Sequence, residues 1–108
     1  MAQLNGQRLI VGLGRTGLSV ARYLHAQGIA FSVCDASEAP SGLNDLREFA
    51  PHVPLFLGGL TPAALLNVVE VIASPGIALR SELLQEAAKR GIPVVGDIEL
   101  FARAVKTP

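Results

Sequence analysis

The chain has 108 residues, half of them hydrophobic, which is enough for one domain with a sizeable core or for a piece of a larger protein. Nine basic and nine acidic residues balance each other and form no basic stripe, which argues against duplex nucleic acid as a partner. No uncharged apolar run reaches the ~18–20 residues of a membrane span, and the single cysteine, Cys34, excludes an internal disulfide and any multi-cysteine metal site.

Strand and helix signals alternate along the first half of the chain. Apolar runs predict strands, and the first helical pattern follows a glycine-rich turn and ends at Gly28, a typical C-terminal cap. Leu18, Ala21 and Leu24 fall on one face of that helix. The predicted segments are strand Arg8–Val11, helix Thr16–Gln27, strand Phe31–Asp35, a short helix over Leu43–Phe49, and strand Val53–Leu57.

The second half of the chain continues the alternation. Thr61 and Pro62 have the pattern of an N-cap and a first helical position, and Ser81 is a second predicted N-cap. The strand at 68–73 is nearly continuous in β-branched residues, as expected where both faces of a strand are buried. The predicted segments are helix Pro62–Asn67, strand Val68–Ala73, helix Ser81–Arg90, strand Ile92–Val95 and helix Ile98–Val105.

Five strands joined by crossover segments predict an α/β fold, a Rossmann-like, doubly wound parallel sheet with the strand order 3-2-1-4-5. The sequence has no repeat, low-complexity segment or internal boundary, so residues 1–108 are expected to form one domain. In a sheet of this kind, ligands bind above the carboxyl ends of the first and fourth strands, where the strand order reverses.

The segment Gly12–Gly17, with the sequence GLGRTG, has the spacing of a nucleotide-binding turn between a strand and a helix. Gly12 permits the tight turn, Gly14 lets a diphosphate approach the backbone, and Gly17 lets the helix pack close to the strand. Free amide groups and the positive end of the helix dipole then attract phosphate. The motif predicts a dinucleotide or a nucleoside diphosphate without choosing between them. A turn that only packs the helix onto the sheet is the alternative.

Two further features fall on the same edge of the predicted sheet. In a NAD-binding domain, Asp35 accepts hydrogen bonds from the adenosine ribose; otherwise its carboxylate only ends a strand in water. The residues of Ser74–Gly76 suit a tight turn, because proline fixes φ and glycine tolerates a positive φ. The strand order makes this turn one wall of the nucleotide slot.

We expect the other side chains with reactive groups to have no chemical role. Asp97 and Glu99 stand two apart at a helix start, where they are expected to cap backbone amides instead of acting as an acid–base pair. Cys34 lies inside an apolar strand and is expected in the core. His25 falls in the last turn of a helix and His52 in a loop, and we assign neither a chemical role.

Two strings follow the fourth and fifth strands, Ala73–Ile77 (ASPGI) and Gly96–Phe101 (GDIELF). Together with Gly12–Gly17, in this order and spacing, they resemble the N-terminal domain of the Mur ligases, and most closely the members that add D-glutamate. The resemblance covers the chain from about Arg8 to its end. It implies that the chain binds the UDP part of UDP-N-acetylmuramoyl-L-alanine, as one domain of a three-domain ligase in peptidoglycan precursor synthesis.

The same resemblance implies two domains that this chain lacks. A central domain, the expected partner within the same protein, would bind ATP and magnesium, and a C-terminal domain would bind the incoming amino acid. The substrate carboxylate would become an acyl phosphate, from which the amine displaces phosphate. The chain has no G-x-x-x-x-G-K-[ST] loop, so we expect no cofactor and no catalysis in it alone. Residues 1–6 lack a signal-peptide core, and the implied pathway is cytoplasmic, so the cytoplasm is the expected location.

The glycine motif and the strand order, together with the resemblance, indicate which residues hold the UDP group. Backbone amides at the helix start would bind the diphosphate, with a threonine hydroxyl as a further donor and an arginine that either adds charge or points to solvent. The residues after the aspartate are too small to stack on the uracil ring, so backbone hydrogen bonds are the contact expected for the uracil. The implied residues are Gly14, Arg15, Thr16 and Gly17 at the diphosphate, Asp35, Ala36 and Ser37 at the uridine, and Ser74, Pro75 and Gly76 as a wall.

Two other functions remain open from the sequence. The first is a NAD-binding Rossmann domain of a dehydrogenase or regulatory protein, in which the same glycine turn serves a dinucleotide. The second is a domain that serves assembly and has an empty nucleotide slot. The strings at Ala73–Ile77 and Gly96–Phe101 favour the UDP-substrate domain over both.

Overall fold

The computed structural model describes residues 6–73 and 81–96. Within them, five parallel strands form one sheet in the order β3-β2-β1-β4-β5, which confirms the predicted class and topology. The strands are β1 (Gln7–Val11), β2 (Phe31–Asp35), β3 (Leu55–Leu57), β4 (Val68–Ala73) and β5 (Val94–Gly96); the helices are α1 (Arg15–Ala26), α2 (Leu43–Phe49), the 3₁₀ turn η2 (Pro62–Leu65) and α3 (Glu82–Lys89).

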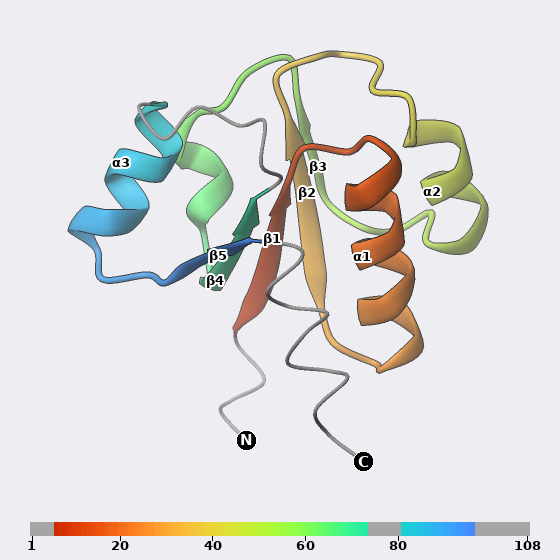
Figure 1. The fold of residues 1–108 in the computed structure, drawn as a ribbon, viewed down its shortest axis with the longest axis horizontal. Helices are drawn as coiled ribbons and strands as arrows, with labels where there is room; N and C mark the ends of the chain where they lie inside the picture. Colours follow the sequence, from red (N-terminus) through yellow and green to blue (C-terminus); the bar gives the residue numbers. More distant parts are fainter. Residues whose placement is uncertain (1–5, 74–80, 97–108) are drawn as a thin grey trace.

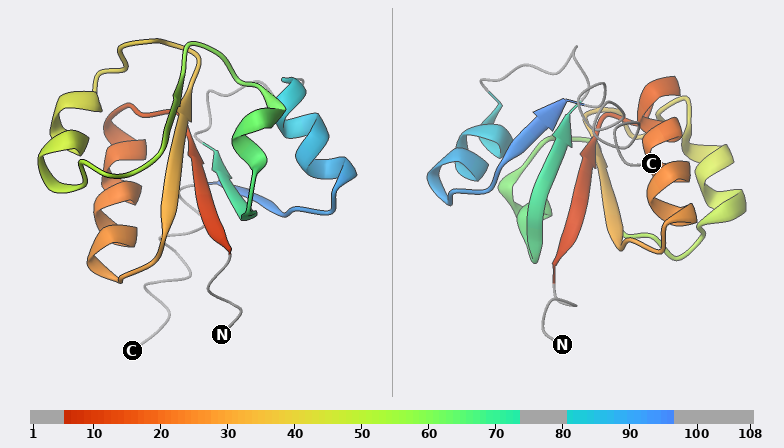
Figure 2. Two further views of the ribbon diagram at one scale, coloured as in Figure 1. Left: turned by 180° about the vertical axis from the view of Figure 1, so that it is seen from behind. Right: turned by 60° about the horizontal axis from the view of Figure 1, so that its bottom comes forward.

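Helices cover both faces of the sheet. Figures 1 and 2 show α1 and α2 together on one face, with η2 and α3 on the other. This division follows from the strand order: the chain moves outward from β1 through β2 to β3, then crosses the sheet and moves outward again through β4 to β5. Because all strands are parallel, the loops after β1, β2 and β3 meet at one edge, at the top of Figure 1.

The core on the α1 side depends on a helical stripe and the alternation of strand residues. The buried residues of α1 are spaced as one face of a helix, and Leu18, which the sequence places on that face, lies partly buried at its border. Ile10 and Val33 point to this face from β1 and β2, while Leu9, Val11 and Cys34 point to the other. The buried residues of α1 are Gly17, Val20, Ala21 and Leu24.

The predicted helix from Pro62 to Asn67 is wrong in type and length. The segment forms only a 3₁₀ turn that ends at Leu65, and the hydroxyl of Thr61 makes no capping hydrogen bond. Leu66 takes an extended conformation (φ −60°, ψ 121°), and Asn67 takes a positive φ of 62°. These two residues turn the chain directly into β4, so no room is left for a second helical turn.

Proline positions explain why two strands differ from their predicted bounds. β3 begins at Leu55 instead of Val53, because Pro54 has no N–H to donate to a neighbouring strand. β5 begins after Pro93 for the same reason, and it extends to Gly96. The amide of Ile92, predicted to start this strand, donates instead to the carbonyl of Ala87 in α3 (2.9 Å).

Candidate functional site

The glycine turn lies between β1 and α1, at the carboxyl edge of the sheet. Gly12 has a positive φ of 100°, and its amide donates to the carbonyl of Cys34 in β2 (2.8 Å). A Cβ atom built on Gly17 would overlap the carbonyl oxygen of Gly12. Gly12 therefore makes the turn, and Gly17 allows α1 to pack against the end of β1, as the motif predicts.

The amino end of α1 is exposed and uncapped among the described residues. Gly14 is its N-cap and offers no side chain, the first turn contains no acidic residue, and Arg15 and Thr16 are exposed. The first intrahelical hydrogen bond runs from the amide of Leu18 to the carbonyl of Gly14 (2.9 Å). The amides of residues 15–17 precede that bond, so they have no partner within the helix.

The amino end of α3 provides a contrast within the same chain. The hydroxyl of Ser81, its N-cap, accepts a hydrogen bond from the amide of Leu84 (3.4 Å), and Glu82 stands in the first turn. A hydroxyl and a carboxylate there occupy the place that an anionic ligand would take. Of these two helix starts, only that of α1 has neither a capping side chain nor an acidic first-turn residue within the described part of the chain.

Gly14 is not required by the fold around it. Its φ of −96° is accessible to any residue, and a Cβ atom built on it meets no atom of the described residues within 4 Å. Gly12 and Gly17 have structural reasons to be glycine, and Gly14 has none among the described residues. Since Gly14 is the N-cap of α1, this open space adjoins the start of the helix.

Asp35 ends β2 and binds two backbone amides with its carboxylate. Oδ2 accepts a hydrogen bond from the amide of Leu13 (2.7 Å), and Oδ1 accepts one from the amide of Ser37 (2.8 Å). Ala36 and Ser37 are exposed beyond it, and the Ser37 hydroxyl accepts from the amide of Ala39 (3.1 Å). The sequence does not predict that Asp35 contacts the glycine turn. The two predicted roles of Asp35, a ribose contact and a solvated carboxylate at the end of a strand, do not include this contact.

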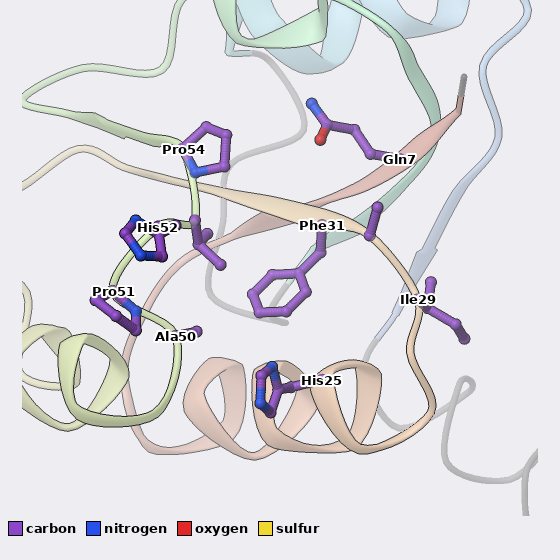
Figure 3. A pocket seen from close by; sticks show the side chains of 10 residues that line it. Gln7, His25, Ile29, Phe31, Ala50, Pro51, His52 and Pro54 are labelled. Atoms are coloured by element: carbon purple, nitrogen blue, oxygen red, sulfur yellow. The ribbon is translucent and has the colours of Figure 1, made fainter. Parts of the chain in front are cut away.

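The described residues also form a hollow at the opposite edge of the sheet. It has a volume of about 380 Å³, and Figure 3 shows its lining side chains, which come from the amino ends of the strands and the ends of α1 and α2. Both histidines lie there, His25 and His52, and the His25 ring packs edge-to-face on Phe49 with centroids 5.4 Å apart. None of the predicted site residues that the structure describes lines this hollow, so it is separate from the glycine turn.

Comparison with known proteins places the chain in a family. The family described as "Mur ligase MurD-like, N-terminal domain" matches residues 6–96. The chain belongs to the MurD-like N-terminal domains of the Mur ligases. This confirms the resemblance seen in its sequence motifs.

Two relatives illustrate how far the similarity extends. The chain is 45% identical over 98% of its length to the UDP-N-acetylmuramoylalanine–D-glutamate ligase of Nitrosococcus oceani, and 46% identical over 94% of its length to that of Pseudomonas putida. It spans 23% and 22% of those two proteins. The UDP-N-acetylmuramate–alanine ligase MurC of Thermotoga maritima shares the fold, with a TM-score of 0.78 at 19% identity. The match covers 93% of this chain and 23% of that protein.

Two sets of predictions fall on residues outside the described part of this MurD-like domain. They are the predicted wall of Ser74, Pro75 and Gly76, and the helix-capping roles of Asp97 and Glu99. The structure brings together the glycine turn and the Asp35–Ser37 segment, which are two of the three predicted components of the site. Among residues 6–73 and 81–96, no group of three or more His, Cys, Asp or Glu side chains is arranged to hold a metal ion.

Cys34 is a core residue, as predicted. Its side chain is fully buried, and its thiol donates to the carbonyl of Gly59 (3.5 Å). Burial and the nearby charge of Asp35 raise the pKa of the Cys34 thiol to about 11, against a smaller lowering by a backbone hydrogen bond at Thr61. The thiol is therefore neutral at any pH at which the domain would work.

We predict that Cys34 in the native chain reacts far more slowly with a thiol-specific disulfide reagent at pH 8 than it does in the urea-unfolded chain. A pKa near 11 instead of 9.0 leaves about a hundredfold less of the reactive thiolate, and burial adds to this protection. Because the folded state holds the proton more tightly, this thiol's contribution to stability is complete below pH 9 and is lost as the pH rises towards 11. Equal rates for the native and unfolded chains would contradict the burial of Cys34.

Proposed function

We propose that the chain binds the UDP part of UDP-N-acetylmuramoyl-L-alanine at the amino end of α1. The observation that carries this proposal is made at Gly14. Among the described residues, the start of α1 has no capping side chain, and the space where a Cβ atom of Gly14 would lie is open. Such helix starts attract phosphate, because the amides point at the ligand and the dipole favours negative charge. The relatives named as UDP-N-acetylmuramoylalanine–D-glutamate ligases support this nucleotide over others.

The remaining groups have complementary roles in this proposal. The amides of residues 14–17 donate to the diphosphate, the Thr16 hydroxyl adds a donor, and exposed Arg15 supplies positive charge without an ion pair among the described residues. Asp35, Ala36 and Ser37 lie at the end of β2 and in the loop after it, and the backbone of this segment holds the uridine. Ser74, Pro75 and Gly76 complete the wall of the slot.

The NAD-binding alternative receives less support from the geometry. In a dinucleotide-binding domain, the carboxylate at the end of β2 accepts hydrogen bonds from ribose hydroxyls. Here each oxygen of Asp35 already accepts from a backbone amide, at 2.7 and 2.8 Å. A ribose would have to share these oxygens with the loops that they hold together.

For the full-length protein, we propose ATP-dependent addition of D-glutamate to the UDP-linked substrate. ATP and magnesium would bind in the part of the relatives' length that this chain does not span, since the chain has no ATP-binding glycine–lysine loop. The role of this domain is to hold the nucleotide end of the substrate. None of the described helices is long and apolar enough to cross a membrane, and we propose that the protein works in the cytoplasm, where its nucleotide substrate would be made.

We predict that the 108-residue chain binds UDP-N-acetylmuramoyl-L-alanine and UDP more tightly than NAD, in calorimetric titrations under one buffer condition. The diphosphate and uracil contacts are common to the first two ligands, so both are expected to bind. Tighter binding of NAD would favour the dinucleotide alternative. Absence of binding for all three ligands would favour a domain that serves assembly only.

We predict that Gly14→Val weakens UDP binding at least about tenfold, or about 1.4 kcal/mol, while the chain still folds. The valine side chain enters the open space beside the start of α1, where a Cβ atom meets no described protein atom within 4 Å. Its cost in the free energy of unfolding is limited to about 1 kcal/mol, the usual loss for a poor N-cap residue. Urea unfolding and UDP titration measure the two effects.

Ala26→Val is the matched control for this variant. It adds apolar volume to the exposed opposite end of the same helix, away from the glycine turn. UDP binding is expected to remain at the wild-type level. A folded Gly14→Val chain that binds UDP as tightly as Ala26→Val would place the ligand elsewhere.

A further inference from the structure

We propose that Asp35 is a positioning residue for the diphosphate half of the nucleotide site. It holds the glycine turn in place through the amide of Leu13, and it thereby governs phosphate affinity instead of recognising the base. The inference rests on the proposed function. It assigns to the Asp35 carboxylate a role different from the ribose or uridine contact that the sequence suggests.

The carboxylate bridges two loops that are distant in sequence. Its two oxygens accept from Leu13, one residue before the N-cap of α1, and from Ser37 in the loop after β2. Both distances are below 2.9 Å, in the range of charge-assisted hydrogen bonds, which are about twice as strong as neutral ones. The Ser37 bond is local, whereas the Leu13 bond spans 22 residues.

Leu13 is held by three separate interactions. Besides the bond from its amide to Asp35, its carbonyl accepts from the amide of Gly42 (3.0 Å). Its side chain is fully buried in the cluster that includes Leu43 and Leu46 of α2. Gly14 follows directly, so the position of the α1 N-cap depends on where Leu13 is fixed.

The backbone of the Asp35 segment also joins a third loop. The carbonyl of Asp35 accepts from the amides of Gly58 (3.0 Å) and Gly59 (3.3 Å), and the Gly58 amide also lies 3.2 Å from the carbonyl of Ser37. The loops after β1, β2 and β3 therefore meet at one residue. Of these contacts, only those of the carboxylate can be removed by a side-chain substitution.

Asp35→Asn separates the two contacts of the carboxylate. Asparagine forms the same local turn as aspartate, so its single oxygen keeps the bond to the Ser37 amide. Its NH₂ group then faces the Leu13 amide, donor against donor, and that bond is lost. The variant also removes a negative charge near an anion site, which by electrostatics alone would strengthen UDP binding.

The experiment is a pair of titrations, with uridine and with UDP, monitored by NMR for the wild type and for Asp35→Asn. We expect the affinity for UDP to fall about tenfold or more, as for the loss of one hydrogen bond to a charged group. We expect the affinity for uridine to change less than about threefold. The advantage of UDP over uridine therefore shrinks in the variant.

Glu38→Gln is the matched control. It removes the same charge from an exposed carboxylate in the same loop, and none of the contacts that join Leu13, Asp35 and Ser37 involves its side chain. Its UDP affinity is expected to stay at the wild-type value or to rise. A fall equal to that of Asp35→Asn would overturn the positioning role.

The remaining outcomes are distinct. A parallel loss of uridine and UDP affinity in Asp35→Asn would mean that the carboxylate contacts the base. Unchanged or tighter UDP binding would mean that the carboxylate does not position the glycine turn. Either result overturns the inference but does not contradict the proposed function. A wild-type chain that binds no UDP contradicts the proposed function, and the inference with it. If Asp35→Asn does not fold, amide exchange in the wild type decides: protection of the Leu13 amide before UDP is added supports the inference, and rapid exchange there overturns it.

Discussion

The close contact between α1 and β1 determines where this domain can bind a ligand. Gly17 brings the helix so near to the turn that a single added carbon atom would overlap the carbonyl oxygen of Gly12. The helix start is thereby fixed beside the carboxyl end of β1, next to β4, where the strand order of the sheet reverses. A helix start in this place, without a capping side chain, provides several donors and a positive dipole end for an anion.

The second feature of the site is that contacts within the protein join its loops to one another. The Asp35 carboxylate, the Leu13 backbone and the Gly42 amide connect the glycine turn with the loop after β2 through bonds of 2.7 to 3.0 Å. A site whose parts are already in place loses less conformational entropy on binding, so more of the contact energy appears as affinity. Such preorganisation suits a domain whose proposed role is to hold one end of a substrate while chemistry takes place elsewhere.

Much of the fold could be predicted from the sequence, because its signals are local. The bounds of β2 and β4 agree with the apolar runs, and the Gly12–Gly17 motif places α1 correctly. The predicted helix after Pro62 is wrong, because Leu66 and Asn67 turn the chain into β4. The helix propensities of these residues do not indicate that turn. At the site, the sequence does not predict the contact between Asp35 and Leu13 or the hollow at the amino edge, because both join residues that share no sequence pattern.

The measurement that tests the central claim most directly is a map of UDP binding by NMR, from the shifts of backbone amide signals in the 108-residue chain. The account predicts that the largest changes fall on the amides of residues 14–17, with smaller changes in the loop after β2. Changes concentrated at the amino edge, around Gln7, His25 and Phe31, would place the ligand in the opposite hollow and contradict the account.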